Sequence, residues 1–128
     1  MTLRESLRIL VVDDTAVSRA LISQSLDELG ITHHTTEGDS RTALGMLAAR
    51  PVHLVIADMN MPGMSGLQLL AALRQNRSTQ RIGFILMTEA PSPEILRQGQ
   101  DLGLNHLVRK PFTTVTLKSG IERVVGRL

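Results

Sequence analysis

The sequence of 128 residues contains no cysteine, tryptophan or tyrosine, and only two phenylalanines, Phe84 and Phe112. The absence of cysteine excludes disulfide bonds, thiolate chemistry and cysteine-based metal sites. The scarcity of aromatic rings leaves no platform on which nucleic-acid bases could stack. The hydrophobic core must therefore be built from Leu, Ile, Val, Ala and Met side chains.

Long apolar runs and a strong charge of one sign are also absent. No run approaches the roughly 18 residues that a membrane-spanning helix needs, and residues 1–6 lead straight into a strand without the apolar core of a signal peptide. These absences predict a cytoplasmic protein that does not insert into membranes. The formal net charge of +2 is spread along the chain, which favours a solvated surface of mixed charge over nucleic-acid binding.

Short apolar runs alternate with segments of helical spacing along the whole chain. Strands of a parallel sheet are buried on both faces and read as apolar runs, whereas surface helices repeat their apolar residues every three to four positions. Strands are predicted at residues 7–12, 31–37, 53–57, 82–87 and 107–109. Helices are predicted at about residues 16–29, 40–50, 67–75, 93–102 and 114–125. The alternation predicts one α/β domain over residues 1–128, with helices on both faces of a parallel sheet.

Polar residues stand where four of these strands end. Asp13 and Asp14 follow the first strand, Asp58 the third, Thr88 the fourth and Lys110 the fifth. Each feature alone is most often a helix cap or a turn. Together they predict a site, because the carboxyl ends of parallel strands meet at one edge of the sheet, where α/β folds bind ligands.

The residue types in this cluster indicate phosphoryl chemistry. Three adjacent carboxylates raise one another's pKa unless a cation joins them, and oxygen ligands suit Mg²⁺ better than zinc. One carboxylate can then act as a nucleophile toward phosphorus. Lys110 and the metal can neutralise the phosphoryl oxygens, and the Thr88 hydroxyl can bind a further oxygen. Without phosphate, Lys110 can pair with Asp58.

With these motifs the chain resembles the receiver domains of two-component response regulators, most closely the stand-alone chemotaxis type, over essentially all of its length. The matching stretches are Ile9–Asp14, Asp58–Gly66, Thr88 and Lys110–Phe112. The resemblance implies a doubly wound, flavodoxin-like (βα)5 fold with strand order 2-1-3-4-5. It also implies a signalling phosphoacceptor that promotes only its own phosphorylation and dephosphorylation, and not an enzyme with a separate substrate.

The resemblance further implies a role for each residue of the cluster. Asp58 would be the phosphoacceptor. Mg²⁺ would be bound by Asp14, Asp58 and the backbone carbonyl of Asn60, with Asp13 acting largely through water. The phosphoryl oxygens would be contacted by Thr88 and Lys110.

The same resemblance implies a cis peptide bond between Lys110 and Pro111, and it implies partners. The phosphoryl donor would be a histidine kinase like that of chemotaxis systems. The target would be a protein such as the flagellar motor switch or another signalling protein. No helix-turn-helix or enzymatic module follows the last predicted helix, so the output surface is expected on the helix at 93–102, the strand at 107–109 and the helix at 114–125.

Two positions depart from the family pattern. Leu107 stands three positions before Lys110, where related receivers usually carry an aromatic residue that turns inward on activation. Either a rotamer change of Leu107 replaces that movement, or Leu107 simply packs in or beside the core.

The second departure is Glu89, which follows Thr88 at a position where the family prefers a small residue. A carboxylate at the pocket entrance should repel an anionic phosphodonor, so we hypothesise that Glu89 alters phosphorylation or dephosphorylation rates; the alternative is a solvated loop glutamate.

The leading interpretation is a receiver that takes a phosphoryl group from a histidine kinase and then binds a target differently. Two alternatives are a phosphate sink that drains the kinase and an interaction module whose binding ignores phosphorylation. A phosphohydrolase is disfavoured, because the Asp-x-Asp nucleophile expected after the first strand is missing.

Overall fold

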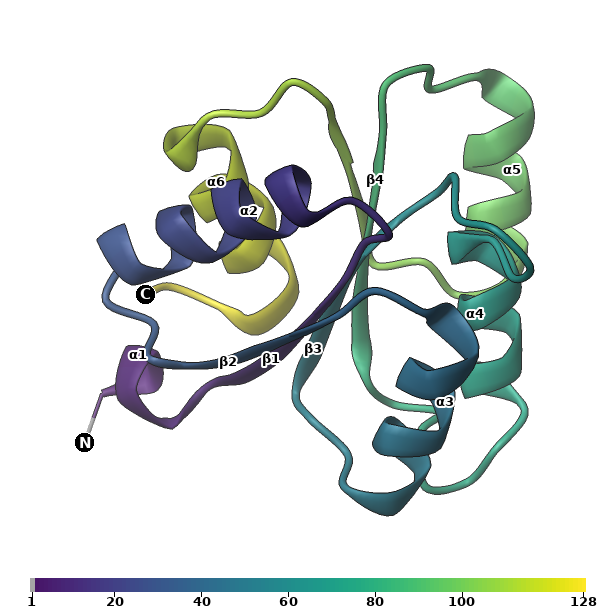
Figure 1. The fold of residues 1–128 in the computed structure, drawn as a ribbon, viewed down its shortest axis with the longest axis horizontal. Helices are drawn as coiled ribbons and strands as arrows, with labels where there is room; N and C mark the ends of the chain where they lie inside the picture. Colours follow the sequence, from purple (N-terminus) through teal and green to yellow (C-terminus); the bar gives the residue numbers. More distant parts are fainter. Residues whose placement is uncertain (1) are drawn as a thin grey trace.

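A five-stranded parallel sheet lies at the centre of the protein, in a computed structural model that describes residues 2–128 (Figure 1). The strands are β1 (Arg8–Val12), β2 (His33–Glu37), β3 (Leu54–Asp58), β4 (Gly83–Thr88) and β5 (His106–Arg109). Their spatial order is β2-β1-β3-β4-β5, and every neighbouring pair is parallel. This order confirms the predicted doubly wound α/β fold.

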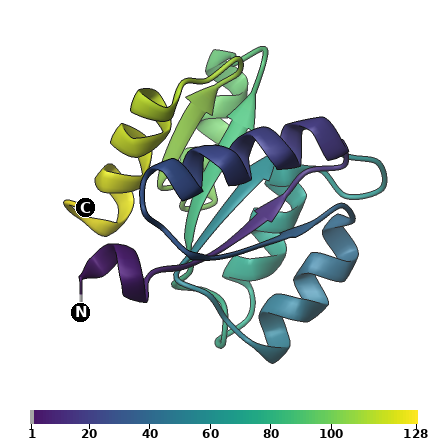
Figure 2. The same ribbon diagram turned by 60° about the vertical axis from the view of Figure 1, so that its left-hand side comes forward.

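The described part of the chain also forms six helices around the sheet: α1 (Leu3–Ser6), α2 (Ala16–Glu28), α3 (Ser40–Ala49), α4 (Gly66–Arg74), α5 (Pro93–Asp101) and α6 (Thr114–Val125). Helices α2 and α6 cover one face, and α3, α4 and α5 cover the other (Figures 1 and 2). The predicted helices and strands agree with the observed ones to within about two residues at each end.

The two faces of the sheet carry separate hydrophobic clusters because successive side chains of a strand point to opposite sides. In β1, Ile9 and Val11 pack against α2 and α6, whereas Leu10 and Val12 pack against α3 and α4. Each of these four side chains is at most 1% exposed. Because the inner strands are buried on both faces, their sequences are unbroken apolar runs. The edge strand β2 is partly exposed, and its sequence is polar.

One element differs from the prediction. Residues 3–6 were expected to lead straight into the first strand, but they form the short helix α1. The Thr2 hydroxyl accepts a hydrogen bond from the Glu5 backbone amide at 3.4 Å, and the Leu7 amide closes the turn onto Leu3 at 2.9 Å. A single turn is too short to show helical spacing, so only the cap residue Thr2 could have indicated it.

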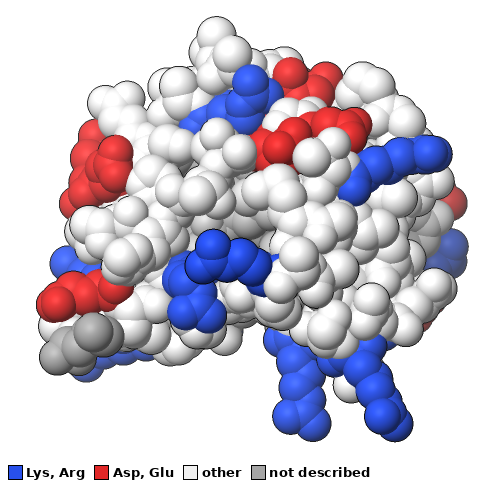
Figure 3. All heavy atoms as spheres, turned by 60° about the horizontal axis from the view of Figure 1, so that its bottom comes forward, with Lys and Arg blue, Asp and Glu red and all other residues white. Residues whose placement is uncertain are grey.

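Among residues 2–128, no helix combines the length and apolar character that crossing a membrane requires. On the face drawn in Figure 3, basic and acidic side chains are interspersed with uncharged ones, and neither sign forms a continuous stripe.

Candidate functional site

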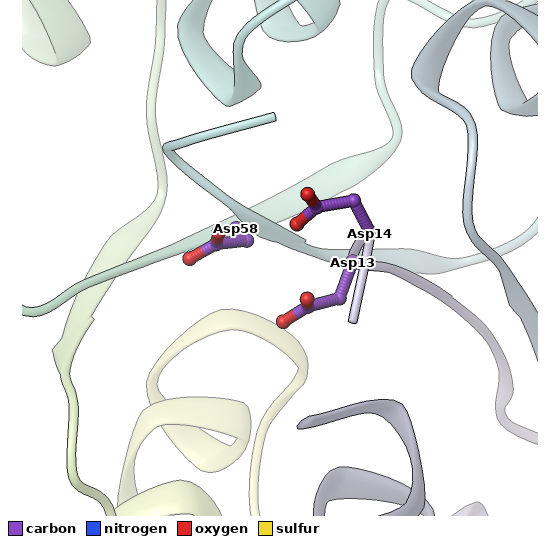
Figure 4. Close-up of side chains that lie close together, drawn as sticks. All are labelled: Asp13, Asp14 and Asp58. Carbon is purple, nitrogen blue, oxygen red and sulfur yellow. The ribbon is translucent and has the colours of Figure 1, made fainter. Parts of the chain in front are cut away.

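Three aspartates meet at the carboxyl edge of the sheet. Asp13 and Asp14 directly follow β1, and Asp58 is the last residue of the neighbouring strand β3. Figure 4 shows the three side chains close together at this edge. One carboxylate oxygen from each residue lies within 4.8 Å of those of the other two. Asp13 is buried, Asp58 is half-buried and Asp14 is exposed. The fold therefore assembles the predicted acidic pocket.

Lys110 closes this pocket from the end of β5. Its Nζ donates to Asp13 Oδ2 at 2.9 Å and pairs with Asp58 Oδ1 at 3.1 Å. The Lys110 backbone amide donates to the Thr88 carbonyl at 2.9 Å, which fixes the end of β5 against β4. The Lys110–Pro111 peptide bond is cis, the isomer that the resemblance implies. The structure thus shows the predicted pairing of Lys110 with Asp58.

The Asp13 carboxylate has a protein donor on each oxygen. Oδ1 accepts from the Thr15 amide at 3.0 Å and from the Thr15 hydroxyl at 3.2 Å. Oδ2 accepts from the Ser18 hydroxyl as well as from Lys110. Arg19 Nη1 also donates to the Asp13 backbone carbonyl at 2.6 Å. Sequence reasoning missed Thr15, Ser18 and Arg19; only Thr15, two residues after Asp13, makes the kind of short-range contact that a local turn pattern could have indicated.

These contacts give the two carboxylates opposite pKa shifts. Burial raises the pKa of Asp13, but hydrogen bonds from Ser18, Lys110 and Thr15 outweigh it, so the Asp13 pKa lies below its usual value. At Asp58, burial outweighs the attraction of Lys110, and the charges of Asp13 and Asp14 add to it, so the Asp58 pKa is raised. Burial lowers the pKa of Lys110, but its bonds to Asp13 and Asp58 outweigh burial and raise it.

The opposite shifts predict opposite stability effects of two matched substitutions. An acid whose pKa is raised on folding destabilises the fold at neutral pH, and this cost disappears as the pH falls below its unfolded pKa. Asp58→Asn should therefore raise the Tm in metal-free buffer at pH 7. An acid with a lowered pKa contributes stability that is lost as the pH falls, so Asp13→Asn should lower the Tm at pH 7.

Thermal unfolding monitored by circular dichroism between pH 3 and pH 7 measures both effects. The Tm difference between each variant and the unsubstituted protein should become smaller toward pH 3. Shifts of the same sign for both variants at pH 7 would contradict the assigned electrostatics.

The remaining predicted residues lie around the same edge. Asn60 and Glu89 are exposed and line the pocket that contains Asp58 and Lys110. Thr88, at the end of β4, is 1% exposed, and its hydroxyl oxygen accepts from the Ala90 amide at 3.2 Å. Glu89 thus stands at the pocket rim, where the sequence predicted it, on a loop that the Thr88 hydroxyl helps to fix.

Leu107 lies away from the acidic residues. It pairs in register with Leu86 of β4, is half-buried, and packs against the hydrophobic cluster beneath α3, α4 and α5. This position agrees with the alternative in which Leu107 packs beside the core.

Three comparisons with known proteins agree with this geometry. The family described as response regulator receiver domain matches residues 9–122. A probable chemotaxis protein CheY of Rhizobium etli is 38% identical, over 100% of this chain and 99% of that protein. The chemotaxis protein CheY of Pseudomonas aeruginosa is 37% identical, and the match covers 95% of this chain and 98% of that protein. The structure of Vibrio cholerae CheY4, 29% identical, superposes with a TM-score of 0.87 over 93% of this chain and 98% of that one.

The family match begins at the second residue of β1 and covers the other four strands, the three aspartates and Lys110. The relatives match the chain from end to end at well above 30% identity. The chain therefore belongs to the response regulator receiver domain family of two-component signalling proteins.

Proposed function

We propose that this chain is a cytoplasmic, chemotaxis-type response regulator whose single receiver domain spans residues 1–128. In this proposal a histidine kinase transfers a phosphoryl group to Asp58, and the phosphorylated protein binds a partner protein with altered affinity. The observation that carries the proposal is the convergence of Asp13, Asp14, Asp58 and Lys110 at one edge of the sheet. Full-length similarity to chemotaxis proteins supports the assignment of the pathway.

Mg²⁺ fits the donor set of the acidic pocket. Within residues 2–128, no protein donor binds the carboxylate of the exposed Asp14, and the Asp58 carboxylate, which lines the pocket, is paired with Lys110 alone. We propose that Asp14, Asp58 and the Asn60 carbonyl hold the ion directly. Asp13 would act through water, because both of its oxygens already accept protein hydrogen bonds. When bound, Mg²⁺ would neutralise charge on the carboxylates and on the phosphoryl group.

The protein residues then have distinct roles in the transfer. An Asp58 carboxylate oxygen attacks phosphorus, a P–O bond forms, and the bond from phosphorus to the histidine nitrogen of the donor breaks. Lys110 exchanges its contact with Asp58 Oδ1 for a phosphoryl oxygen while it keeps Asp13. The Thr88 hydroxyl accepts from Ala90, so its own proton is free to bind another phosphoryl oxygen. The protein acts only on its own phosphorylation state.

A small phosphodonor tests the phosphoacceptor step without the unknown kinase. Intact-protein mass spectrometry after incubation with phosphoramidate should show one added phosphoryl group with Mg²⁺. Little or none should be added when the metal is chelated. Equal phosphorylation with and without Mg²⁺ would reject the metal-assisted site.

The output is proposed on the surface formed by α5, β5 and α6, with a partner such as the flagellar motor switch or another signalling protein. The core packing of Leu107 favours one competing function, an interaction module that ignores phosphorylation, because position 107 carries no aromatic ring that could turn inward on phosphorylation. Partner affinity measured with and without beryllofluoride and Mg²⁺ separates the two. A changed affinity supports the switch, and equal affinities support the constitutive module.

Glu89 is expected to slow phosphorylation by anionic donors. Its exposed carboxylate lines the pocket and adds negative charge at the entrance. Glu89→Ala should accelerate phosphorylation by phosphoramidate by at least about threefold at low ionic strength, and less in salt, since screening weakens the repulsion. Glu94→Ala, which removes an exposed carboxylate from α5, serves as the control. If the phosphorylation and dephosphorylation rates of Glu89→Ala both stay within about twofold of those of the unsubstituted protein, Glu89 does not control either rate.

A further inference from the structure

Ser18 bridges the two halves of the acidic pocket. It lies in the first turn of α2, and its hydroxyl donates to Asp13 Oδ2 and accepts from Lys110 Nζ at 2.9 Å. Lys110 Nζ donates to the same Asp13 oxygen, also at 2.9 Å. The hydroxyl, the carboxylate and the ammonium thus form a closed triangle of hydrogen bonds between the start of α2 and the end of β5.

This triangle determines how the ammonium group is oriented. A lysine ammonium has three N–H donors, and here they are directed to Ser18 Oγ, Asp13 Oδ2 and Asp58 Oδ1. A lysine side chain is a flexible stem that loses considerable rotamer freedom when it is held. Two of the three acceptors are independent of Asp58, so the ammonium can keep its place when the contact to Asp58 is exchanged for a phosphoryl oxygen.

The Ser18 hydroxyl is not explained by helix capping. Thr15 occupies the N-cap position of α2, and Ser18 lies inside the helix. Its hydrogen-bonding partners are the Asp13 carboxylate and a lysine 92 residues away in the sequence. A serine within a helix is usually directed to solvent or to its own backbone, so these contacts indicate a role in the pocket.

We infer that Ser18 is a positioning residue, which holds Lys110 at the Asp13 side of the pocket and so places its ammonium for a phosphoryl group on Asp58. The inference rests on the proposed function. Without the hydroxyl, Lys110 keeps its charge and its pairing with Asp13 but loses the hydrogen bond to Ser18, so its ammonium group is held in fewer directions. Ser18→Ala should therefore weaken the binding of the phosphoryl group much more than the binding of the metal, because within residues 2–128 the Ser18 side chain hydrogen bonds to Asp13 and Lys110 and not to Asp14 or Asn60.

Beryllofluoride binding separates these two effects. Its affinity at saturating Mg²⁺, measured by ¹⁹F NMR, should fall about tenfold in Ser18→Ala, the size expected for a hydrogen bond to a charged group. The Mg²⁺ affinity without beryllofluoride, measured by calorimetry, should change less than about twofold. Ser18→Thr keeps the hydroxyl and should restore beryllofluoride binding. Ser23→Ala is the matched control, since Ser23 lies on the same helix and makes no side-chain hydrogen bond within residues 2–128.

The outcomes are distinct. Unchanged beryllofluoride affinity in Ser18→Ala overturns the inference while the proposed function stands. Equal losses of beryllofluoride and Mg²⁺ affinity, or no restoration by Ser18→Thr, show a general structural effect and also overturn it. Failure of the unsubstituted protein to bind beryllofluoride would reject the proposed function, and the role of Ser18 with it.

Discussion

Asp58→Asn is expected to reduce phosphorylation by at least about a thousandfold, below the level that intact-mass measurement detects. The asparagine amide keeps the size and hydrogen-bonding capacity of the side chain but lacks the anionic oxygen that attacks phosphorus. Asp13 cannot substitute, because both of its oxygens accept protein donors and one is held by Lys110. Asp14 is exposed and has no Lys110 contact among the hydrogen bonds of residues 2–128.

The control for this variant removes a carboxylate elsewhere. Asp101 is exposed at the end of α5, so Asp101→Asn should be phosphorylated like the unsubstituted protein. The far-ultraviolet circular dichroism of Asp58→Asn should match that of the unsubstituted protein, because the substitution removes a charge and no core packing. Phosphorylation of Asp58→Asn at more than about a tenth of the normal extent would show that another residue is the acceptor.

Gly66→Ala is expected to lower the free energy of unfolding by about 3 kcal/mol, a large value for the addition of one methyl group. Gly66 is the first residue of α4, which lies closely against the end of β3. A Cβ at this position would lie 2.5 Å from the Asp58 carbonyl oxygen and 2.6 Å from Leu86 Cδ1. The leucine can adjust, but the backbone of Asp58 can move only if the phosphoacceptor moves with it.

Gly45→Ala is the matched control for this effect. Gly45 lies inside α3, and apart from its chain neighbours and the backbone of its own helix, no heavy atom of the described residues lies within 4 Å of a Cβ placed there. Alanine is favoured over glycine in a helix interior, so this variant should gain about 0.5–1 kcal/mol. Urea denaturation of both variants measures the difference. A loss of less than about 0.5 kcal/mol in Gly66→Ala would mean that the contact between α4 and β3 is not tight.

The fold and the positions of the acidic residues could be predicted because both follow from local signals. Buried parallel strands are apolar runs, and polar residues at their ends must meet at one edge of the sheet. Asp13, Asp14, Asp58 and Lys110 were found in this way. The strand order and the cis bond before Pro111 came only from the resemblance to a family, since spacing alone does not determine either.

The parts that were missed depend on tertiary contacts. Whether the hydroxyl of Ser18 turns into the pocket depends on how α2 lies on the sheet, and helical spacing alone does not show this. The hydrogen bond between Ser18 and Lys110 joins the start of α2 to the end of β5, and no local sequence pattern predicts a contact between residues so far apart. Helix α1 was missed because one turn is shorter than the period that reveals a helix.

The central claim is that Asp58 carries the phosphoryl group. An acyl phosphate can be reduced by borohydride, which converts a phosphorylated aspartate to homoserine and leaves free aspartates unchanged. Protein phosphorylated with phosphoramidate and Mg²⁺, then reduced and digested, should contain homoserine at position 58 and nowhere else. Homoserine at Asp13 or Asp14 with intact Asp58, or at no position in a protein that has gained a phosphoryl group, would contradict the account.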